Sequence, residues 1–149
     1  MKLFTIGFTK KSAKEFFDLL KSNNIKKIID IRLNNSSQLA GFTKGNDLKY
    51  FLEVICNIDY EHDMSLAPTQ EILDGYKKKK INWDQYEQLF KNLLITRNSI
   101  DTINCKNKND YDNLCLLCSE LSPKNCHRRL VAEYIKENNP DISIEIIHL

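Results

Sequence analysis

The first 32 residues alternate between strand and helix patterns, and this alternation limits the fold more than any other feature of the sequence. Residues 3–6 are a short apolar run closed by Gly7, as expected of a buried strand that turns at its end. Ser12 and Glu15 have the spacing of a capping box, which predicts a helix start. Residues 26–32 contain three isoleucines and predict a second strand. Together these segments predict a βαβ unit, with a parallel strand pair and a right-handed crossover.

The same alternation continues to the end of the chain. Residues 114–118, Leu-Cys-Leu-Leu-Cys, are a continuous apolar run, which is typical of a strand covered on both faces. We therefore expect an α/β fold: a single three-layer domain over residues 1–149, with a mainly parallel sheet and right-handed βαβ crossovers. The other expected segments are a loop over 34–46, a helix over 47–56, a strand over 58–62, helices beginning at Pro68, Asn82 and Ser122, and a strand over 142–147.

The composition is that of a globular protein. Hydrophobic residues make up 42% and charged residues 28% of the 149 residues, which argues against disorder. No apolar run approaches the roughly 18–20 residues of a membrane span, and the N-terminus does not resemble a signal peptide, so we expect a cytoplasmic protein without a membrane partner. The formal charge of +2 does not indicate a protein that coats nucleic acid, and five cysteines, an odd number, are expected to be reduced thiols.

Three segments are expected to meet at one edge of the sheet. In open parallel sheets, ligands bind beyond the carboxyl ends of the strands. Residues 7–9 follow the first strand, Arg32 ends the second, and residues 118–129 follow the strand over 114–118. We therefore expect the functional site at this edge.

The start of the last helix has the features of an anion site. His127, Arg128 and Arg129 begin a helix that has no acidic residue before Glu133. Cations oppose the helix dipole there, whereas free backbone N–H groups and two guanidinium groups suit a phosphate or carboxylate. The alternative is that Arg129 pairs with Glu133 while Arg128 is solvated. The expected ligand is an anionic small molecule or a nucleic-acid end, and the expected ligand-binding residues are Gly7, Thr9, Arg32, Arg128 and Arg129.

Four residues are candidates for catalysis. A helix N-terminus and nearby cations lower the pKa of a thiol, so Cys126 is a candidate nucleophile, with a buried core residue as the alternative. His127 is a candidate acid or base, or else a core histidine bonded to a carbonyl or carboxylate. Glu120 either serves as a base or caps the following turn. Asp30 either transfers a proton or forms an ion pair with Arg32, since the two residues share one strand face.

Cys115 and Cys118 have the Cys-x-x-Cys spacing of a metal or redox pair. Residues three apart in a strand point to opposite faces, so their two sulfurs cannot bind one ion. We therefore expect no metal ion and no other cofactor.

Several blocks resemble those of one known family: Thr5-Ile-Gly-Phe with Glu15-Phe-Phe, Asp30-Ile-Arg32, Leu39-Ala-Gly-Phe42 with Asp47 to Leu52, Leu66-Ala-Pro-Thr69, and Cys118-Ser-Glu120 with Pro123 and Cys126-His-Arg128. From about Thr5 to Tyr134 the chain resembles the domain of unknown function 488 (DUF) family, and the Cys-His-Arg block is the most specific part. The resemblance implies the α/β fold and the location of the site, and it implies no reaction. Many members have histidine at the position of Phe8. This chain therefore lacks one candidate acid or base, which disfavours a mechanism that needs two histidines.

These expectations lead to one leading hypothesis, an intracellular enzyme that acts on a phosphate-bearing nucleotide or nucleic-acid ligand at the Cys-His-Arg helix start. The alternative is a non-catalytic anion- or nucleic-acid-binding or regulatory module, in which this segment only locks the helix to the sheet. A third hypothesis is a redox-linked thiol protein centred on Cys126 or Cys118.

Overall fold

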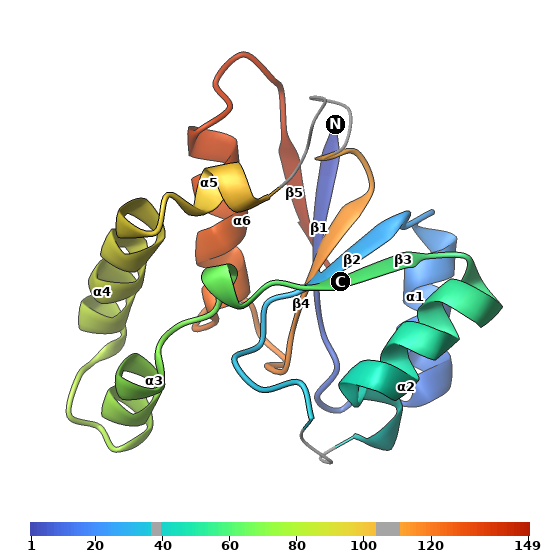
Figure 1. Ribbon diagram of the computed structural model, residues 1–149, viewed down its shortest axis with the longest axis horizontal. Helices are drawn as coiled ribbons and strands as arrows, with labels where there is room; N and C mark the ends of the chain where they lie inside the picture. Colours follow the sequence, from blue (N-terminus) through green and yellow to red (C-terminus); the bar gives the residue numbers. More distant parts are fainter. Residues whose placement is uncertain (37–39, 104–110) are drawn as a thin grey trace.

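A five-stranded sheet forms the centre of the computed structural model, which describes residues 1–36, 40–103 and 111–149 (Figure 1). The strand order is β3-β2-β4-β1-β5, and every neighbouring pair is parallel. The expected α/β class with a mainly parallel sheet is confirmed. The strands are β1 (Lys2–Gly7), β2 (Lys27–Asp30), β3 (Asp59–His62), β4 (Leu114–Cys118) and β5 (Glu145–His148).

Strand β4 comes late in the sequence and lies in the middle of the sheet. It pairs with β1 on one side and with β2 on the other. The first two strands are therefore parallel, as expected, but they are not hydrogen-bonded to each other. All five residues of β4 are buried, which agrees with the apolar run expected of a strand covered on both faces.

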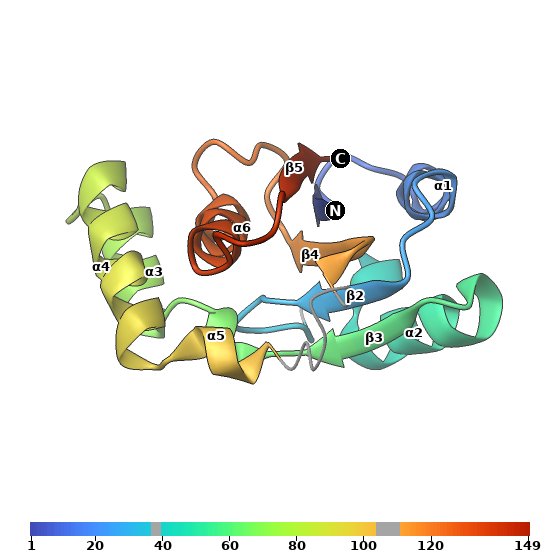
Figure 2. The ribbon, with the colours of Figure 1, turned by 90° about the horizontal axis from the view of Figure 1, so that it is seen from above.

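Helices cover both faces of the sheet (Figure 2). α1 (Ala13–Ser22) and α2 (Gly45–Tyr50) lie on one face, and α4 (Trp83–Thr96) and α6 (His127–Glu137) lie on the other. Alternate strand residues enter two separate cores: Leu116 packs on the side of α4 and α6, whereas Leu117 packs on the side of α1 and α2. The result is the three-layer arrangement that the sequence predicted.

The remaining helices, α3 (Gln70–Lys77) and α5 (Ser99–Thr102), lie on the same side of the sheet as α4 and α6 and pack against the same core. α3 packs beside α4, and α5 follows α4 along the chain. In the part of the chain that the structure describes, no helix is both long enough and apolar enough to cross a membrane.

The helix starts confirm the local signals of the sequence. The Ser12 side chain accepts a hydrogen bond from the Glu15 N–H, and the Glu15 carboxylate accepts one from the Ser12 N–H. Asn82 and Gln85 form the same reciprocal pair at the start of α4, and the Thr69 side chain caps α3. These caps involve residues three positions apart, so the sequence alone is enough to predict them.

Two expected helices differ from the structure. The helix expected from Ser122 begins at His127, because residues 122–126 form a turn in which the Cys126 N–H donates to the Pro123 carbonyl at 3.2 Å. The helix expected over 47–56 is α2 followed by a π-helical turn, Phe51–Cys56. Residues 37–39 of the expected loop over 34–46 lie outside the described residues.

Replacement of Gly7 tests how closely β1 approaches the loop after β4. A Cβ atom on Gly7 would lie 1.7 Å from the backbone oxygen of Glu120 and 2.8 Å from Nη1 of Arg128. We expect Gly7→Ala to lower the free energy of unfolding by about 1–3 kcal/mol in urea denaturation, because the loop must move. The matched control is Gly41→Ala, where a Cβ meets nothing within 4 Å. Equal losses in the two variants would contradict the close approach.

Candidate functional site

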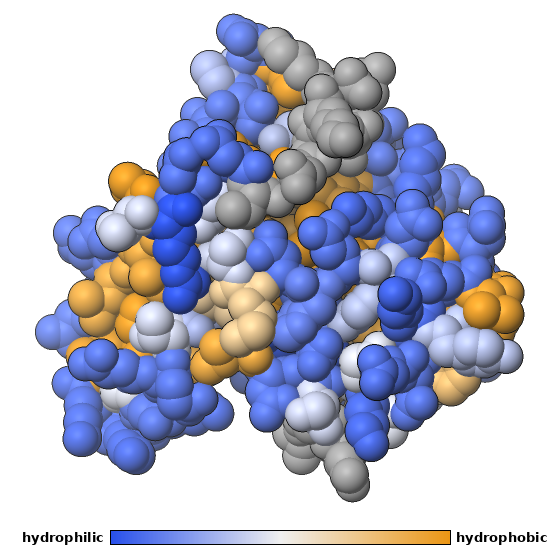
Figure 3. Space-filling model, in the orientation of Figure 1, coloured by the Kyte–Doolittle hydropathy of each residue, from blue (hydrophilic) through white to orange (hydrophobic). Residues whose placement is uncertain are grey.

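The carboxyl ends of β1, β2 and β4 meet at one edge of the sheet, as the strand order requires. Gly7 lies opposite Cys118 in the register of β1 and β4, and Asp30 lies opposite Leu117 in the register of β2 and β4. Near this edge the surface is hollowed between α3 and the segment that follows β2 (Figure 3). The structure therefore brings together most of the segments that the sequence assigned to the site.

Arg128 is completely buried and holds the loop that follows β4. Its Nη1 donates to the Glu120 carbonyl oxygen, and its Nη2 donates to that of Leu121 at 3.1 Å. Its Nε donates to the Thr5 hydroxyl oxygen at 3.3 Å, and Nη1 also lies 3.6 Å from the Cys126 sulfur. The expectation of a solvated Arg128 is therefore wrong. Its ligand-binding role stays a prediction.

The loop after β1 is fixed to the same segment. The Thr9 N–H donates to the Ser119 carbonyl oxygen at 3.1 Å, and the Thr9 hydroxyl donates to the same oxygen at 2.6 Å. The absence of a side chain at Gly7 leaves room for the carbonyl of Glu120. Thr9 and Gly7 therefore support the loop after β4, and their roles in ligand binding stay predictions.

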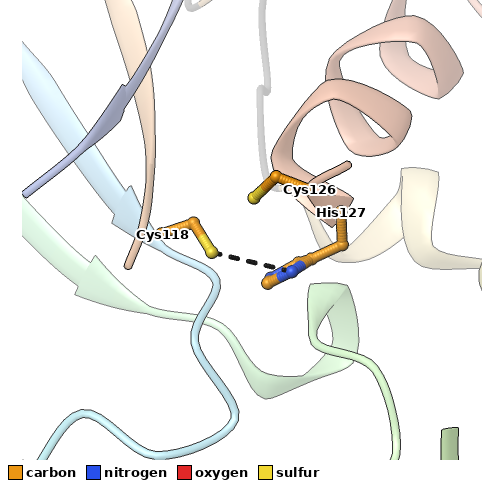
Figure 4. A group of neighbouring side chains, drawn as sticks. All are labelled: Cys118, Cys126 and His127. Carbon is orange, nitrogen blue, oxygen red and sulfur yellow. Dashed lines mark hydrogen bonds between the residues drawn. The ribbon is translucent and has the colours of Figure 1, made fainter. Parts of the chain in front are cut away.

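Two cysteines and a histidine meet between the end of β4 and the start of α6 (Figure 4). Nδ1 of His127 lies 3.6 Å from Sγ of Cys118, and the donor atoms of Cys118, Cys126 and His127 all lie within 4.8 Å of one another. The three residues are only 4%, 2% and 7% exposed. We call them the Cys-Cys-His cluster. Cys115 packs in the core on the other face of β4, so the sulfurs of the Cys-x-x-Cys pair are separated, as expected.

The orientation of the His127 ring is set by a backbone carbonyl. Its Nε2 lies 2.8 Å from the oxygen of Ile31, which confirms the interpretation of a histidine bonded to a carbonyl. Because a carbonyl oxygen only accepts, Nε2 carries a proton. In the neutral ring, Nδ1 then presents its lone pair to the sulfurs. The edge-to-face contact with Phe90 at 5.7 Å holds the ring from the side of α4.

The two thiols of the cluster differ in acidity. The hydrogen bond from Cys126 is the main cause that lowers the pKa of Cys118, and the backbone N–H of Glu120 and the charge of Arg128 add to it against the effect of burial. The same hydrogen bond, followed by burial, raises the pKa of Cys126. The acidifying effect that the sequence predicted for Cys126 therefore acts on Cys118. All four described cysteines are free thiols, and Cys105 lies outside the described residues.

Asp30 and Arg32 form a buried ion pair, as the ion-pair interpretation of the sequence states. Arg32 donates through Nε and Nη2 to the two carboxylate oxygens at 2.8 and 2.6 Å, and Nη2 also donates to the Thr43 carbonyl at 2.8 Å. The Tyr60 hydroxyl donates to Asp30 at 2.7 Å. Burial, followed by the charge of Asp30, raises the pKa of Tyr60. Proton transfer by Asp30 stays a prediction.

Arg129 faces away from the cluster. Its Nη1 donates to Glu133 at 2.8 Å, which confirms the expected ion pair, and its Nη2 donates to Glu87 on α4 at 2.9 Å. Glu120 is an exposed residue, and its backbone carbonyl makes the contact with Arg128. These contacts do not bear on ligand binding by Arg129 or on catalysis by Glu120. Both roles stay predictions.

The partnership between Cys118 and Cys126 is not predicted from the sequence. Cys118 shares its strand with Cys115, but the sulfur that it meets comes from Cys126, across a turn. The available signal was a Cys-x7-Cys-His spacing that starts at a strand end and finishes at a helix start.

Arg128→Met tests whether the buried guanidinium supports the fold. The variant keeps most of the apolar length and leaves the carbonyls of Glu120 and Leu121 without their donor. We expect a loss of about 3 kcal/mol or more in the free energy of unfolding, measured by denaturant titration. The control is Arg129→Met, which removes two partly exposed ion pairs and is expected to cost about 1 kcal/mol or less. A similar loss in both variants would refute the structural role of Arg128.

Comparison with protein families gives a match over residues 12–135 to the model described as Domain of unknown function DUF488. The matched span contains Asp30, Arg32 and the Cys-Cys-His cluster. Neither the curated proteins nor the solved structures include a match to the chain. Since the family model covers well over half of the sequence, the chain belongs to the DUF488 family.

Proposed function

We propose, in place of the metal-free site expected from the sequence, that the protein is a metal-dependent enzyme whose Cys-Cys-His cluster holds a zinc-class cation. One observation carries this proposal: two sulfurs and one ring nitrogen, from two different elements, lie within 4.8 Å of one another in a buried position. Thiolate sulfur and imidazole nitrogen are the donors that zinc prefers, and such sites are commonly formed by three or four residues.

The spacing of the donors fits a tetrahedral ion. With Zn–S and Zn–N bonds of about 2.3 and 2.0 Å, the edge between a sulfur and a nitrogen of a regular tetrahedron measures about 3.5 Å. The distance between Cys118 Sγ and His127 Nδ1 is 3.6 Å. The two side chains can therefore bind one ion with little rearrangement.

The surroundings of the cluster also suit a metal site. A histidine ligand normally donates its other ring N–H to a carbonyl or carboxylate, and His127 does so to Ile31. Nη1 of Arg128 lies 3.6 Å from the Cys126 sulfur. Backbone N–H groups of Ser119 and Glu120 approach Cys118. Donors of this kind stabilise sulfur in its anionic, ligating form.

Three protein ligands distinguish a catalytic centre from a closed structural one. A structural zinc ion normally has four protein ligands, whereas a catalytic ion keeps one position for water or substrate. When bound, such an ion supplies Lewis acidity and lowers the pKa of a coordinated water to about 7. A phosphate-bearing nucleotide or nucleic-acid end stays the predicted substrate within this proposal. Two of the three arginines that the sequence suggests for that ligand already bind other groups of the protein, Arg128 the loop carbonyls and Arg129 two glutamates.

The alternative is a non-catalytic module in which the segment only locks α6 to the sheet. The contacts of Arg128 with two loop carbonyls and of His127 with Ile31 favour it, because each is a structural bond without a ligand. This alternative predicts a stable protein that binds no metal.

Metal binding separates the two functions. We expect the reduced protein to retain about one equivalent of zinc after dialysis, measured by atomic emission, because three donors converge on one point. Cys118→Ala removes one donor and is expected to weaken binding by about tenfold or more. Cobalt should give a thiolate charge-transfer band that the same variant loses.

The control is Cys115→Ala, the same substitution three residues earlier on the same buried strand. It leaves the cluster intact and is expected to retain zinc. The proposal fails if wild-type protein retains no zinc, or if the two variants lose it equally.

A further inference from the structure

The guanidinium of Arg32 has one buried nitrogen without a hydrogen-bond partner. Arg32 is 3% exposed, and its Nε and Nη2 are engaged by Asp30 and Thr43. Its Nη1 has no acceptor among the described residues. An unsatisfied buried donor costs about 1–3 kcal/mol, and more when it is charged, so this nitrogen favours the binding of an acceptor.

The free nitrogen is directed away from the ion pair, and Arg32 lies next to the cluster. The pair with Asp30 uses the edge of the guanidinium formed by Nε and Nη2, so Nη1 lies on the opposite edge. The Phe8 ring faces the guanidinium carbon at 5.3 Å, and Phe8 directly follows Gly7, the partner of Cys118 in the sheet register. The residue before Arg32, Ile31, accepts the hydrogen bond from Nε2 of His127 at 2.8 Å, which places Arg32 beside the cluster.

Buried charge at this edge is not balanced. Among the residues that the structure describes, those both buried and formally charged are Arg32, Arg128 and Asp30, which gives two cations against one carboxylate. The Tyr60 hydroxyl and the main-chain N–H of Arg32 also donate to the Asp30 carboxylate. Because these bonds offset part of the negative charge of Asp30, less of it is available to neutralise the guanidinium of Arg32. A buried excess of positive charge is costly unless an anion neutralises it.

We infer that Nη1 of Arg32 binds one oxygen of an oxyanion, a phosphate or a carboxylate, at the sheet edge beside the Cys-Cys-His cluster. This assigns an anion subsite to Arg32 alone of the three arginines that the sequence suggested. It extends the proposed function by naming the side-chain atom that would bind the oxyanion of the substrate. Its catalytic meaning rests on that proposal, whereas the binding itself does not.

The subsite also separates two roles within one side chain. The Nε–Nη2 edge fixes the guanidinium, and the Nη1 edge meets the ligand. A lysine at this position can keep the charge and a contact with Asp30, but it lacks the rigid fork that directs a second donor. Arg32→Lys is therefore the informative substitution.

The test is a titration of metal-free wild-type protein with inorganic phosphate, and separately with acetate, followed by NMR of the guanidinium groups in arginine-labelled protein. We expect the Arg32 Nη resonances to shift and saturate with phosphate if the natural ligand is a phosphate, or with acetate if it is a carboxylate. Arg32→Lys should assign the signal and weaken binding by about tenfold. Arg97→Lys is the matched control, because Arg97 donates to the backbone carbonyls of residues 64, 65 and 67 and carries no subsite role.

The titration of wild-type protein tests anion binding at Arg32 even if Arg32→Lys fails to fold. Arg32 resonances that stay unchanged with both anions, or anion binding that Arg97→Lys weakens as much as Arg32→Lys, would overturn the inference. Zinc content, measured on the same samples, reports separately on the proposed function. If the Arg32 resonances shift with an anion but the protein binds no zinc, the anion subsite is supported and the metal centre is rejected. If the protein binds zinc but the Arg32 resonances do not shift, the metal centre is supported and the anion subsite is rejected.

Discussion

The site depends on one buried cation. Arg128 carries its charge into the interior at a helix start, where the helix dipole opposes it, and the carbonyls of Glu120 and Leu121 compensate for the loss of water. Those carbonyls belong to the loop between β4 and α6, so the same bonds that satisfy the charge also set the path of the loop. The position of Cys126 relative to Cys118 follows from that path, and so does the geometry of the whole cluster.

This arrangement explains why a helix rich in cations does not form an open anion pocket. The two neighbouring arginines point in different directions, Arg128 into the loop and Arg129 to glutamates on the helix surface. Among the described residues, two buried arginine nitrogens have no hydrogen-bond partner, Nη1 of Arg32 and Nε of Arg129. Arg129 faces the glutamates and not the cluster, so Arg32 is the candidate for a ligand. The proposed metal centre lies between the end of β4 and the start of α6, and the proposed anion subsite follows the end of β2, the strand that pairs with β4.

The sequence predicted the fold class, the caps and several pairings because those depend on local spacing. Ser12 with Glu15, Arg129 with Glu133 and Asp30 with Arg32 are all within four residues of each other, and all three pairs are present. It did not predict that β4 separates β1 from β2, or that Cys118 meets Cys126, because both depend on where a late strand enters the sheet. The start of α6 was placed too early, since the bonds of Arg128 that shape the loop are set by tertiary structure.

The central position of β4 has a consequence for folding during synthesis. β1 pairs only with β4 and β5, so it has no sheet partner until residue 114 and those after it leave the ribosome. At about 5–20 residues per second, the 113 preceding residues take roughly 6–23 s to make. During that interval the apolar face of α1 has no completed sheet to cover it, and a chaperone can bind there. The strand that ends this exposure, β4, also contains Cys118. The chain therefore completes its core and adds the first residue of the Cys-Cys-His cluster in the same step.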